Sequence, residues 1–452
     1  MKKLTRRKFI ATASAGTVAA VASGAIPFKD ISFVNSNSGK LAILGGAPAI
    51  TAKKWPDWPY IDEKVISEVV ETTKSGIWCR IQSPNNKVQK FENEFAKLMG
   101  IKTSIATGSG TQSLNTCVEA LGIGPGDEVI TSPYTDPGTI ASILVSRALP
   151  VMADLDPDSF QLDPDDVERC ITKRTKALMP VHMMGQPCNM ERIMEIAKKH
   201  NLNVIEDSAQ AHFAEYQGKK VGLIGDVGCF SFQTSKVLCC GEGGGIISNN
   251  EELMDKCYTV HNHGTSKRGK TETIGSKYRM NEFEAAVLLG QLPGVMDRHY
   301  IRNRNAKYLT EHLKECPGLV PQKLYPGTTA GSWYLYSWSY KKDLFNGAPR
   351  EKFLKAIAAE GISLSPYIAN GLHKEPWTQH IQTLPVYKKM YGASRMKKFN
   401  SELHLPKCDQ VCEDMVMLWA SGPLLGTLAD MDDLVNAVMK VYVNRDKLNS
   451  IR

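Results

Sequence analysis

The chain has 452 residues, of which 42% are hydrophobic and 23% are charged, and its formal net charge is +8. This composition is ordinary for a globular protein and excludes a disordered or fibrous class. Five basic residues and no acid fall within the first 25 positions, so the rest of the chain carries only +3. A nucleic-acid-binding surface is therefore not predicted.

The first 25 residues have the layout of a signal peptide: a basic start, an apolar run rich in Ala, Gly and Ser, and small residues near Ala25. Residues 5–10, TRRKFI, resemble the twin-arginine export signal. A membrane anchor or a chance arginine pair is the alternative. No other run approaches the about 20 apolar residues that cross a bilayer. We expect export to the periplasm or beyond, and no stable membrane span after signal removal.

The cysteines follow no metal-binding or redox pattern. There are 11 of them, an odd number; Cys239 and Cys240 are adjacent, and Cys408 and Cys412 are separated by four positions. Neither spacing suits a zinc site or a redox pair. The sequence therefore predicts no metal site and mostly buried free thiols, although a disulfide is possible in an oxidising compartment.

Between about residues 41 and 292, short apolar runs alternate with helical patterns such as 189–200, whose apolar residues are three and four positions apart. The predicted strands span residues 103–107, 127–132, 149–155, 176–182, 202–207, 228–233 and 243–248. Buried strands that alternate with helices predict an α/β fold with a mainly parallel sheet covered on both faces. Ligands of such sheets bind at the carboxyl ends of the strands.

The pattern changes near residue 300. A helix is expected over 302–316, a half-exposed strand over 332–340, and further helices over 350–361 and 430–444. These elements predict a smaller α+β domain. The expected organisation is a signal peptide at 1–25, a large domain at 41–300 and a small C-terminal domain at 301–452.

Lys236 stands between an apolar run and a glycine cluster in CFSFQTSKVLCCGEGGGIIS. A lysine that forms a Schiff base must be held rigidly and partly desolvated, so that its neutral form is accessible. Asp207 ends an earlier predicted strand, and an acid there could keep the ring nitrogen of pyridoxal phosphate protonated. Taken alone, Lys236 could be a solvated loop lysine, and Asp207 could be a helix cap or a surface acid.

A phosphate site completes this pattern. Residues 107–114, TGSGTQSL, follow a predicted strand and open a helix, so the N–H groups of Gly110, Thr111 and Gln112 could hold a phosphate. The hydroxyl of Ser231 could add to them. The order of these residues along one α/β sheet favours a pyridoxal phosphate site over a chance collection of turns.

Across nearly all of the chain after the leader, the sequence resembles the DegT/DnrJ/EryC1/StrS group of sugar and cyclitol aminotransferases, which are fold type I pyridoxal phosphate enzymes. The most specific matches are LGIGPGDEVITSPYT (121–135), RTKALMPVHMMGQPCNM (174–190), VIEDSAQAH (204–212), GDVGCFSFQTSKVLCCGEGGG (225–245) and YRMNEFEAA (278–286). The LAILGGAPAI opening and the LLGTLADMDD ending look most like the branch that acts on cyclitols and related ring ketones.

The resemblance implies a role for each cofactor residue. Lys236 would form the Schiff base and then move a proton between the substrate carbon and the cofactor. Asp207 would pair with the ring nitrogen, and Gln210 would lie near the phenolic oxygen. Ser231 and the backbone of residues 110–112 would hold the phosphate.

The resemblance also places His182, His263 and Arg279 toward the substrate. Either histidine could equally be a hydrogen-bonded core or loop residue, and Arg279 could be a structural ion-pair partner. Lys277 stands where relatives usually have an asparagine that reaches the phosphate of the neighbouring subunit. A lysine could still meet a phosphate, as a point charge.

Asp136 is a second departure, because relatives place an aromatic ring that stacks on the cofactor at this position. Either Tyr134 takes over the stacking, or the substrate pocket is rebuilt around the carboxylate.

The sequence thus predicts a ping-pong aminotransferase that moves an amino group from glutamate or glutamine to a keto sugar or keto cyclitol. A homodimer with shared active sites is expected, and twofold dimers are the commonest symmetric assembly. One alternative is other pyridoxal phosphate chemistry such as dehydration, against which Lys236 argues, because dehydratases of the family have histidine there. A regulatory or structural cofactor-binding protein and a binding module without cofactor are the others.

Overall fold

The computed structural model describes residues 39–51, 55–84 and 86–451, so the predicted signal peptide at 1–25 lies outside the described residues. Within these ranges every helix is too short or too polar to span a bilayer. All eleven cysteines are free thiols, and most are buried.

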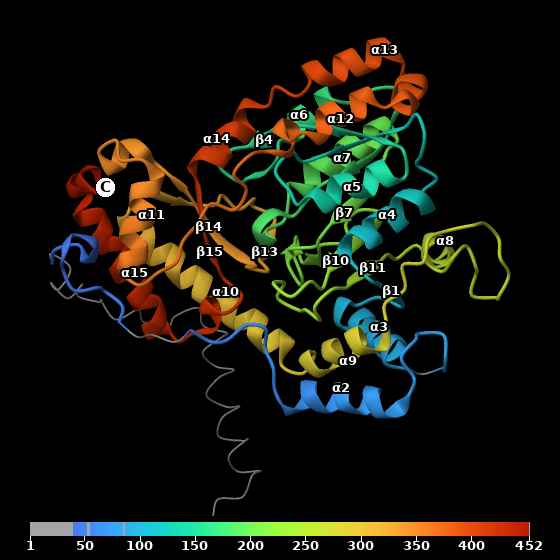
Figure 1. Ribbon diagram of the computed structural model, residues 1–452, viewed down its shortest axis with the longest axis horizontal. Coiled ribbons are helices and arrows are strands. Elements are labelled where there is room, and N and C mark those ends of the chain that lie inside the picture. The colour runs from blue at the N-terminus through green and yellow to red at the C-terminus, as the bar shows by residue number, and fades with distance from the viewer. Residues whose placement is uncertain (1–38, 52–54, 85, 452) are drawn as a thin grey trace, which may run out of the picture. The chain divides into compact units, whose positions relative to one another are not determined.

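A seven-stranded sheet forms the centre of the unit that spans residues 40–452 (Figure 1). Its strands, in spatial order, are β1 (Ser104–Thr107), β11 (Gly244–Ile247), β10 (Val227–Ser231), β7 (Asn203–Asp207), β6 (Thr175–Met179), β2 (Glu128–Thr131) and β3 (Leu149–Met152). β11 is antiparallel to both of its neighbours, whereas the other neighbouring strands are parallel. The predicted mainly parallel α/β sheet is confirmed.

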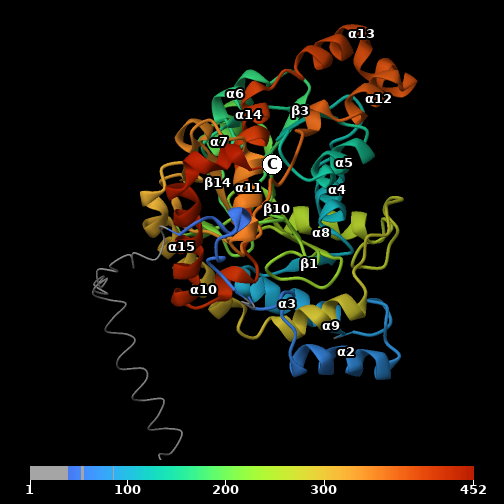
Figure 2. The ribbon, with the colours of Figure 1, turned by 60° about the vertical axis from the view of Figure 1, so that its left-hand side comes forward.

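Helices cover both faces of this sheet (Figures 1 and 2). One face carries α4 (Gly110–Ala120), α5 (Pro137–Val145) and α8 (Glu251–His261); the other carries α3 (Lys87–Met99), α6 (Pro164–Arg169), α7 (Met190–His200) and α9 (Glu282–Gln291), which packs on α2 (Glu63–Ser75). In β7, Val204 packs with α7 and the next residue, Ile205, packs with α4 and α8. Burial on both faces explains why the strands are continuous apolar runs.

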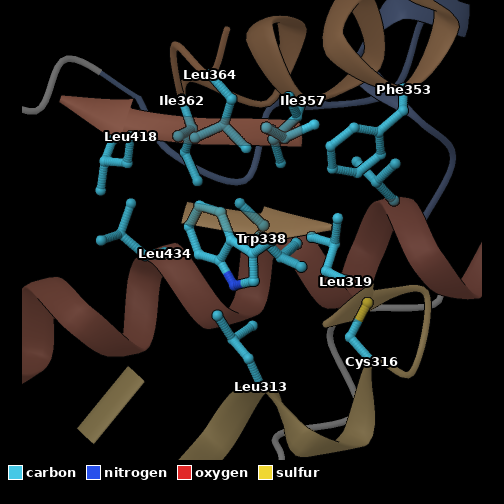
Figure 3. Packing of buried hydrophobic residues seen from close by; sticks show 14 of the residues in the cluster. Leu313, Cys316, Leu319, Trp338, Phe353, Ile357, Ile362, Leu364, Leu418 and Leu434 are labelled. Carbon is cyan, nitrogen blue, oxygen red and sulfur yellow. The ribbon is translucent and has the colours of Figure 1, made fainter. Parts of the chain in front are cut away.

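A smaller antiparallel sheet contains β12 (Leu319–Pro321), β14 (Leu335–Tyr340) and β15 (Met415–Trp419). It packs against α10 (Val295–His312), α11 (Arg350–Ala359) and α15 (Leu428–Val443). Figure 3 shows Trp338 of β14 among Leu313 and Leu434. All six residues of β14 are buried, so the prediction of a half-exposed strand was wrong. The reason is that β14 is the central strand and its two faces contact two different clusters, as Trp338 and Leu335 show.

The segment before β15 returns to the large sheet (Figure 1). It consists of α12 (Trp377–Thr383), α13 (Pro385–Ser401) and α14 (Pro406–Asp414). Tyr391 donates a hydrogen bond to the carbonyl of Asp127 at 2.7 Å, and Arg395 pairs with Glu128. These contacts cover the β2–β3 side of the sheet. The predicted domain boundary at residues 300 and 301 falls within α10 and stays a prediction.

The remaining elements are short. The two-residue and three-residue strands are β4 (Leu155–Asp156), β5 (Gln161–Leu162), β8 (Glu215–Tyr216), β9 (Lys219–Lys220) and β13 (Thr328–Ala330). The 3₁₀ turns are η2 (Ala42–Leu44), η3 (Met183–Gly185), η4 (Leu313–Glu315), η5 (Lys342–Phe345), η6 (Leu372–Lys374), η7 (Pro423–Leu425) and η8 (Arg445–Ser450). The predicted strand over 149–155 is thus divided into β3 and β4.

Candidate active site

The carboxyl ends of β2, β7 and β10 and the first residues of α4 open onto one cavity of about 470 Å³. Parallel strands bring their carboxyl ends to the same edge of a sheet, which is where the ligands of such folds bind. The cavity is lined by Asp136 after β2, Asp207 at the end of β7, and Ser231 and Lys236 at and after the end of β10. The fold therefore brings together the residues that the sequence separates by about a hundred positions.

The loop that carries Lys236 is held from the C-terminal part of the chain. The hydroxyl of Ser421 donates to the carbonyl of Ser235 at 3.0 Å, and the hydroxyls of Ser235 and Tyr334 lie 2.8 Å apart. The amide of Lys236 donates to the carbonyl of Gln233 at 2.8 Å. These bonds fix the backbone from which the Lys236 side chain enters the cavity.

The amine of Lys236 is buried and has no ionic partner among the residues that the structure describes. The residue is 9% exposed, and its Nζ lies 4.2 Å from the ring centroid of Tyr334. Within the described residues Nζ makes neither a hydrogen bond nor an ion pair. Burial lowers the pKa of the ammonium to about 8, against the opposing charges of Asp136 and Asp207. A neutral, nucleophilic amine is therefore accessible near neutral pH.

Asp207 is fixed by two hydrogen bonds. Its Oδ2 accepts from the hydroxyl of Thr139 at 2.7 Å, and its Oδ1 accepts from the amide of Ala209 at 3.2 Å. Burial raises the pKa of this carboxyl, whereas the hydrogen bond from Thr139 lowers it. Sequence reasoning missed Thr139. Its position in the first turn of the helix that Asp136 caps is a signal that could have found it.

The start of α4 and the end of β10 form a cradle. An added Cβ at Gly110 would lie 2.8 Å from the Cβ of Ser231, so only glycine allows this approach. Ser109 caps the helix, and its hydroxyl accepts from the amide of Gln112 at 3.2 Å. The N–H group of Gln112 is thus already used and its side chain does not line the cavity, which corrects its predicted role. The N–H groups of Gly110 and Thr111, with the Ser231 hydroxyl, suit a phosphate.

Asp136 is an exposed residue at the rim of the cavity and also the N-cap of α5. Its Oδ1 accepts from the amide of Gly138 at 2.8 Å. Tyr134 does not replace the stacking aromatic, which corrects that hypothesis: it is fully buried in a hydrophobic cluster and lies outside the cavity. The structure therefore has the Asp136 carboxylate, rather than an aromatic ring, at this position of the cavity lining.

An aromatic wall also lines this cavity. It consists of Tyr334, Tyr367 and Trp419, with ring centroids 5.7 Å apart for Tyr334 and Trp419 and 6.3 Å apart for Tyr367 and Trp419. Gln210 also lines the cavity, and its Nε2 donates a hydrogen bond to the hydroxyl of Tyr367 at 3.0 Å. Sequence reasoning missed these three rings because nothing in their local sequence ties them to the distant Lys236.

His182 belongs to the core rather than to the cavity, which corrects its predicted substrate role. Its Nδ1 accepts from the amide of Cys188 at 3.1 Å, so its Nε2 carries the hydrogen and lies 3.0 Å from Oε2 of Glu206. Glu206 also accepts hydrogen bonds from the amides of residues 222, 224 and 225. The pair therefore ties the segment after β6 to the loop of residues 222–225.

His263, Lys277 and Arg279 lie on the connection between α8 and α9 and do not line the cavity of their own chain. The first two are exposed. Arg279 donates from Nη1 to the side chain of Asn262 at 3.1 Å. Backbone bridges join Lys277 to Asn262 and Arg279 to Thr107, so in a single chain this connection lies beside α8 and β1. The roles predicted for the three residues at a substrate or at the phosphate of a neighbouring subunit stay predictions.

The residues of the cavity fit pyridoxal phosphate. Lys236 offers a buried amine that has no polar partner in the described part of the chain, and Asp207 offers a carboxyl held by two donors. Gly110, Thr111 and Ser231 form the cradle. An amine, an acid and an anion site that converge on one cavity are the parts that this cofactor requires.

The comparisons with known proteins agree with this fit. The model of the DegT/DnrJ/EryC1/StrS aminotransferase family matches residues 59–417. The L-glutamine:2-deoxy-scyllo-inosose aminotransferase of Streptoalloteichus tenebrarius is 35% identical over 430 residues, covering 91% of this chain and 99% of the relative. The L-glutamine:scyllo-inosose aminotransferase of Streptomyces griseus is 32% identical, covering 89% and 98%.

Among solved structures, the aminotransferase from Psychrobacter cryohalolentis superposes with a TM-score of 0.76 at 28% identity, covering 87% of this chain and all of the other. The expected fold type I architecture is confirmed. The chain belongs to the DegT/DnrJ/EryC1/StrS aminotransferase family.

Proposed function

We propose that this protein is a pyridoxal phosphate enzyme that moves an amino group from glutamate or glutamine to a keto sugar or keto cyclitol in two half-reactions. The observation that carries the proposal is the buried amine of Lys236, which shares a cavity with the fixed carboxyl of Asp207 and makes no polar contact within the described residues. The names of the two bacterial relatives support glutamine as donor and a ring ketone as acceptor.

Each cavity residue has a task in this chemistry. When bound, the cofactor supplies an electron sink and carries the amino group between the half-reactions. Asp207 holds a proton at the ring nitrogen, and Gly110, Thr111 and Ser231 hold the phosphate. The neutral Nζ of Lys236 takes the proton from the substrate carbon that bears the nitrogen and returns it. Burial keeps water away from these groups, which strengthens their electrostatic interactions.

The test uses the purified protein loaded with pyridoxal phosphate. Glutamine or glutamate should convert its absorption spectrum to that of the pyridoxamine form. Lys236→Ala should abolish the borohydride-trapped covalent adduct without unfolding the protein, whereas the matched Lys219→Ala variant, at an exposed position, should keep the adduct. A coloured protein that no amino acid converts would instead support a regulatory or structural role. A folded protein without any bound chromophore would overturn the proposal.

We further propose that two copies share their active sites. No arginine or histidine occurs among the described residues that line the cavity, although the donor carboxylate requires a cation. His263, Lys277 and Arg279 lie on a connection that also exposes Ile274, which is 89% accessible. A second copy could bring this connection to the cavity. Sedimentation should give the mass of a dimer, and mixing Lys277→Ala with Lys236→Ala chains should restore activity through mixed dimers.

Export is the third part of the proposal, and it rests on the sequence of residues 1–25 alone. The twin-arginine route carries folded proteins, so the enzyme could bind its cofactor before it crosses the membrane.

A further inference from the structure

Arg302 of α10 is a buried cation without an acid beside it. The residue is 1% exposed, and no carboxylate pairs with its guanidinium among the residues that the structure describes. Burial and the neighbouring charge of Arg298 lower its pKa to about 9, so it still carries its charge at neutral pH. An unpaired buried charge costs free energy, and such exceptions to ordinary packing are expected where function requires them.

The first contact of Arg302 leads to the loop that carries Lys236. Its Nη2 donates a hydrogen bond to the carbonyl of Ser421 at 2.8 Å. The hydroxyl of Ser421 in turn donates to the carbonyl of Ser235 at 3.0 Å. That carbonyl and the amide nitrogen of Lys236 belong to one planar peptide group. Through one intermediate residue, Arg302 therefore reaches the peptide plane from which the Lys236 side chain departs.

A second contact reaches the preceding peptide group. The guanidinium of Arg302 lies over the ring of Trp58, with 4.9 Å between its Cζ and the ring centroid. The ring nitrogen Nε1 of Trp58 donates to the carbonyl of Thr234 at 3.2 Å. Both routes thus begin at one planar cation and end on consecutive carbonyls directly before Lys236. Two fixed carbonyls in a row determine the position and the direction of the chain there, which a single bond does not.

The amine of Lys236 depends on this support. Within the described part of the chain its Nζ makes no hydrogen bond, and its amide donates to the carbonyl of Gln233 in the same loop. The backbone therefore decides where the amine lies and how much water reaches it. A displacement of a reacting group by about 1 Å can slow an enzyme about a hundredfold.

We propose that Arg302 is a positioning residue for the transamination reaction: acting through Ser421 and Trp58, it fixes the peptide groups before Lys236 and so holds the amine in the cavity. Arg302 does not line the cavity itself, so it is not a catalytic residue. This inference rests on the proposed function and adds to it a residue that touches neither the cofactor nor the substrate.

The first test uses Arg302→Lys, which keeps a buried cation but replaces the planar guanidinium by one ammonium group. Cofactor-free protein is mixed with pyridoxal phosphate at several pH values, and the reaction rates give the pH midpoint of the Lys236 amine. We expect the midpoint to rise by about one pH unit, because a looser loop admits water to this amine. Asp136 and Asp207, whose charges raise the pKa of Lys236, are unchanged in the variant.

Steady-state kinetics of the cofactor-loaded protein provide a second readout. In Arg302→Lys, kcat with glutamine should fall about tenfold to a hundredfold, because the reacting nitrogen is displaced. KM should change by less than about twofold, because the variant leaves the lining of the cavity in place.

A second variant tests the two routes rather than Arg302 itself. Ser421→Ala removes the hydroxyl that reaches Ser235, and Trp58→Phe removes the donor that reaches Thr234 but keeps a ring face for the guanidinium. The double variant should raise the midpoint and lower kcat as Arg302→Lys does. Adding Arg302→Lys to it should lower kcat by less than about a further twofold, because changes that act through the same contacts are not additive.

Arg298 provides the matched control, because it lies one turn earlier on α10 and makes the same kinds of contact. Its guanidinium carbon lies 4.2 Å from the ring centroid of Tyr60, and it donates to the carbonyl of Gln291. The side chain of Gln291 accepts from the amide of Cys239, three residues beyond Lys236, rather than reaching the peptide groups before the lysine. Arg298→Lys should therefore leave the midpoint and kcat unchanged.

An unchanged midpoint and kcat in Arg302→Lys, normal behaviour of the double variant, or an equal effect of Arg298→Lys would overturn the inference. Thermal unfolding shows whether each variant is folded, and if Arg302→Lys is not, the double variant decides alone. These outcomes are separable from failure of the proposed function. If glutamine does not convert the unchanged, loaded protein, the function is wrong, whereas the midpoints of the cofactor-free proteins still test the role of Arg302.

Discussion

Thr139 and Asp207 are joined by a hydrogen bond of 2.7 Å between Oγ1 and Oδ2. The bond connects the first turn of α5 to the end of β7, and the amide of Ala209 holds the other oxygen of the carboxyl. Asp207 is therefore held both by α5 and by the turn that follows β7. A buried carboxyl needs such donors to remain charged, because burial alone raises its pKa.

Thr139→Val should weaken catalysis by about tenfold to a hundredfold, since a hydrogen bond to a charged group contributes about 1.5–3 kcal/mol. Thr139 lowers the pKa of Asp207, so its loss raises this pKa further and protonates the carboxyl at a higher pH. The loss of kcat/KM should thus be largest at the acid end of the pH profile. Thr139→Ser, which keeps the hydroxyl, should restore the profile. An unchanged profile in Thr139→Val would contradict this role.

The pKa of Lys236, about 8, predicts how cofactor-free protein reacts with pyridoxal phosphate. The rate should increase with pH, and the midpoint of this increase should lie near pH 8, because the neutral amine is the nucleophile. Asp136 opposes the downward shift, so Asp136→Asn should move the midpoint to lower pH, whereas Glu251→Gln should not. A midpoint near that of a solvated lysine, about 10.4, would contradict the burial argument.

The lowered pKa of Lys236 also affects the stability of the folded protein. Between pH 8 and the pKa of an unfolded lysine, the unfolded chain binds a proton that native Lys236 does not. The free energy of unfolding should therefore rise with pH across this window, and Lys236→Met should remove that part of the slope. Urea unfolding at several pH values measures the free energy of unfolding and its slope with pH.

Gly110→Ala should weaken cofactor binding and lower stability by about 1–3 kcal/mol, because the new methyl group would meet Ser231 at 2.8 Å. The clash would push the start of α4 from the end of β10 and open the phosphate cradle. The matched control is Gly124→Ala, where the nearest atom lies 3.6 Å from an added Cβ. Equal effects of the two changes on the dissociation constant of pyridoxal phosphate would argue against the cradle.

His182→Ala should lower stability by about 2–4 kcal/mol, since it leaves the buried Glu206 carboxylate without one of its donors. The remaining folded protein should keep its KM for the ring substrate, because His182 does not line the cavity. Thermal unfolding and steady-state kinetics together test this. A raised KM with unchanged stability would restore the substrate role.

Replacing Arg6 and Arg7 together by lysine should abolish export while leaving the purified enzyme unaffected, because the twin-arginine receptor reads the arginine pair. Fractionation of cells that express the tagged full-length chain measures the location. Continued delivery outside the cytoplasm would refute this route.

The large sheet could be predicted because each strand is a short apolar run bounded by turns, and this local pattern needs no knowledge of distant residues. β7 and β10 were both expected, and with them the positions of Asp207 and Lys236 at strand ends. The prediction that β14 is half-exposed was wrong, because the alternation of residue types along a strand does not reveal whether a second layer covers its other face.

Local sequence thus determined the order of strands and helices, the buried lysine and the acid on the same edge of the sheet. Tertiary structure alone decided what surrounds them. Tyr334, Tyr367 and Trp419 reach the cavity because the small sheet packs against the large one, and Tyr134 and His182 leave it because their side chains point into the core. The physical reason is that hydrogen bonds and burial depend on contacts between residues far apart in the chain, which periodicity and spacing do not record.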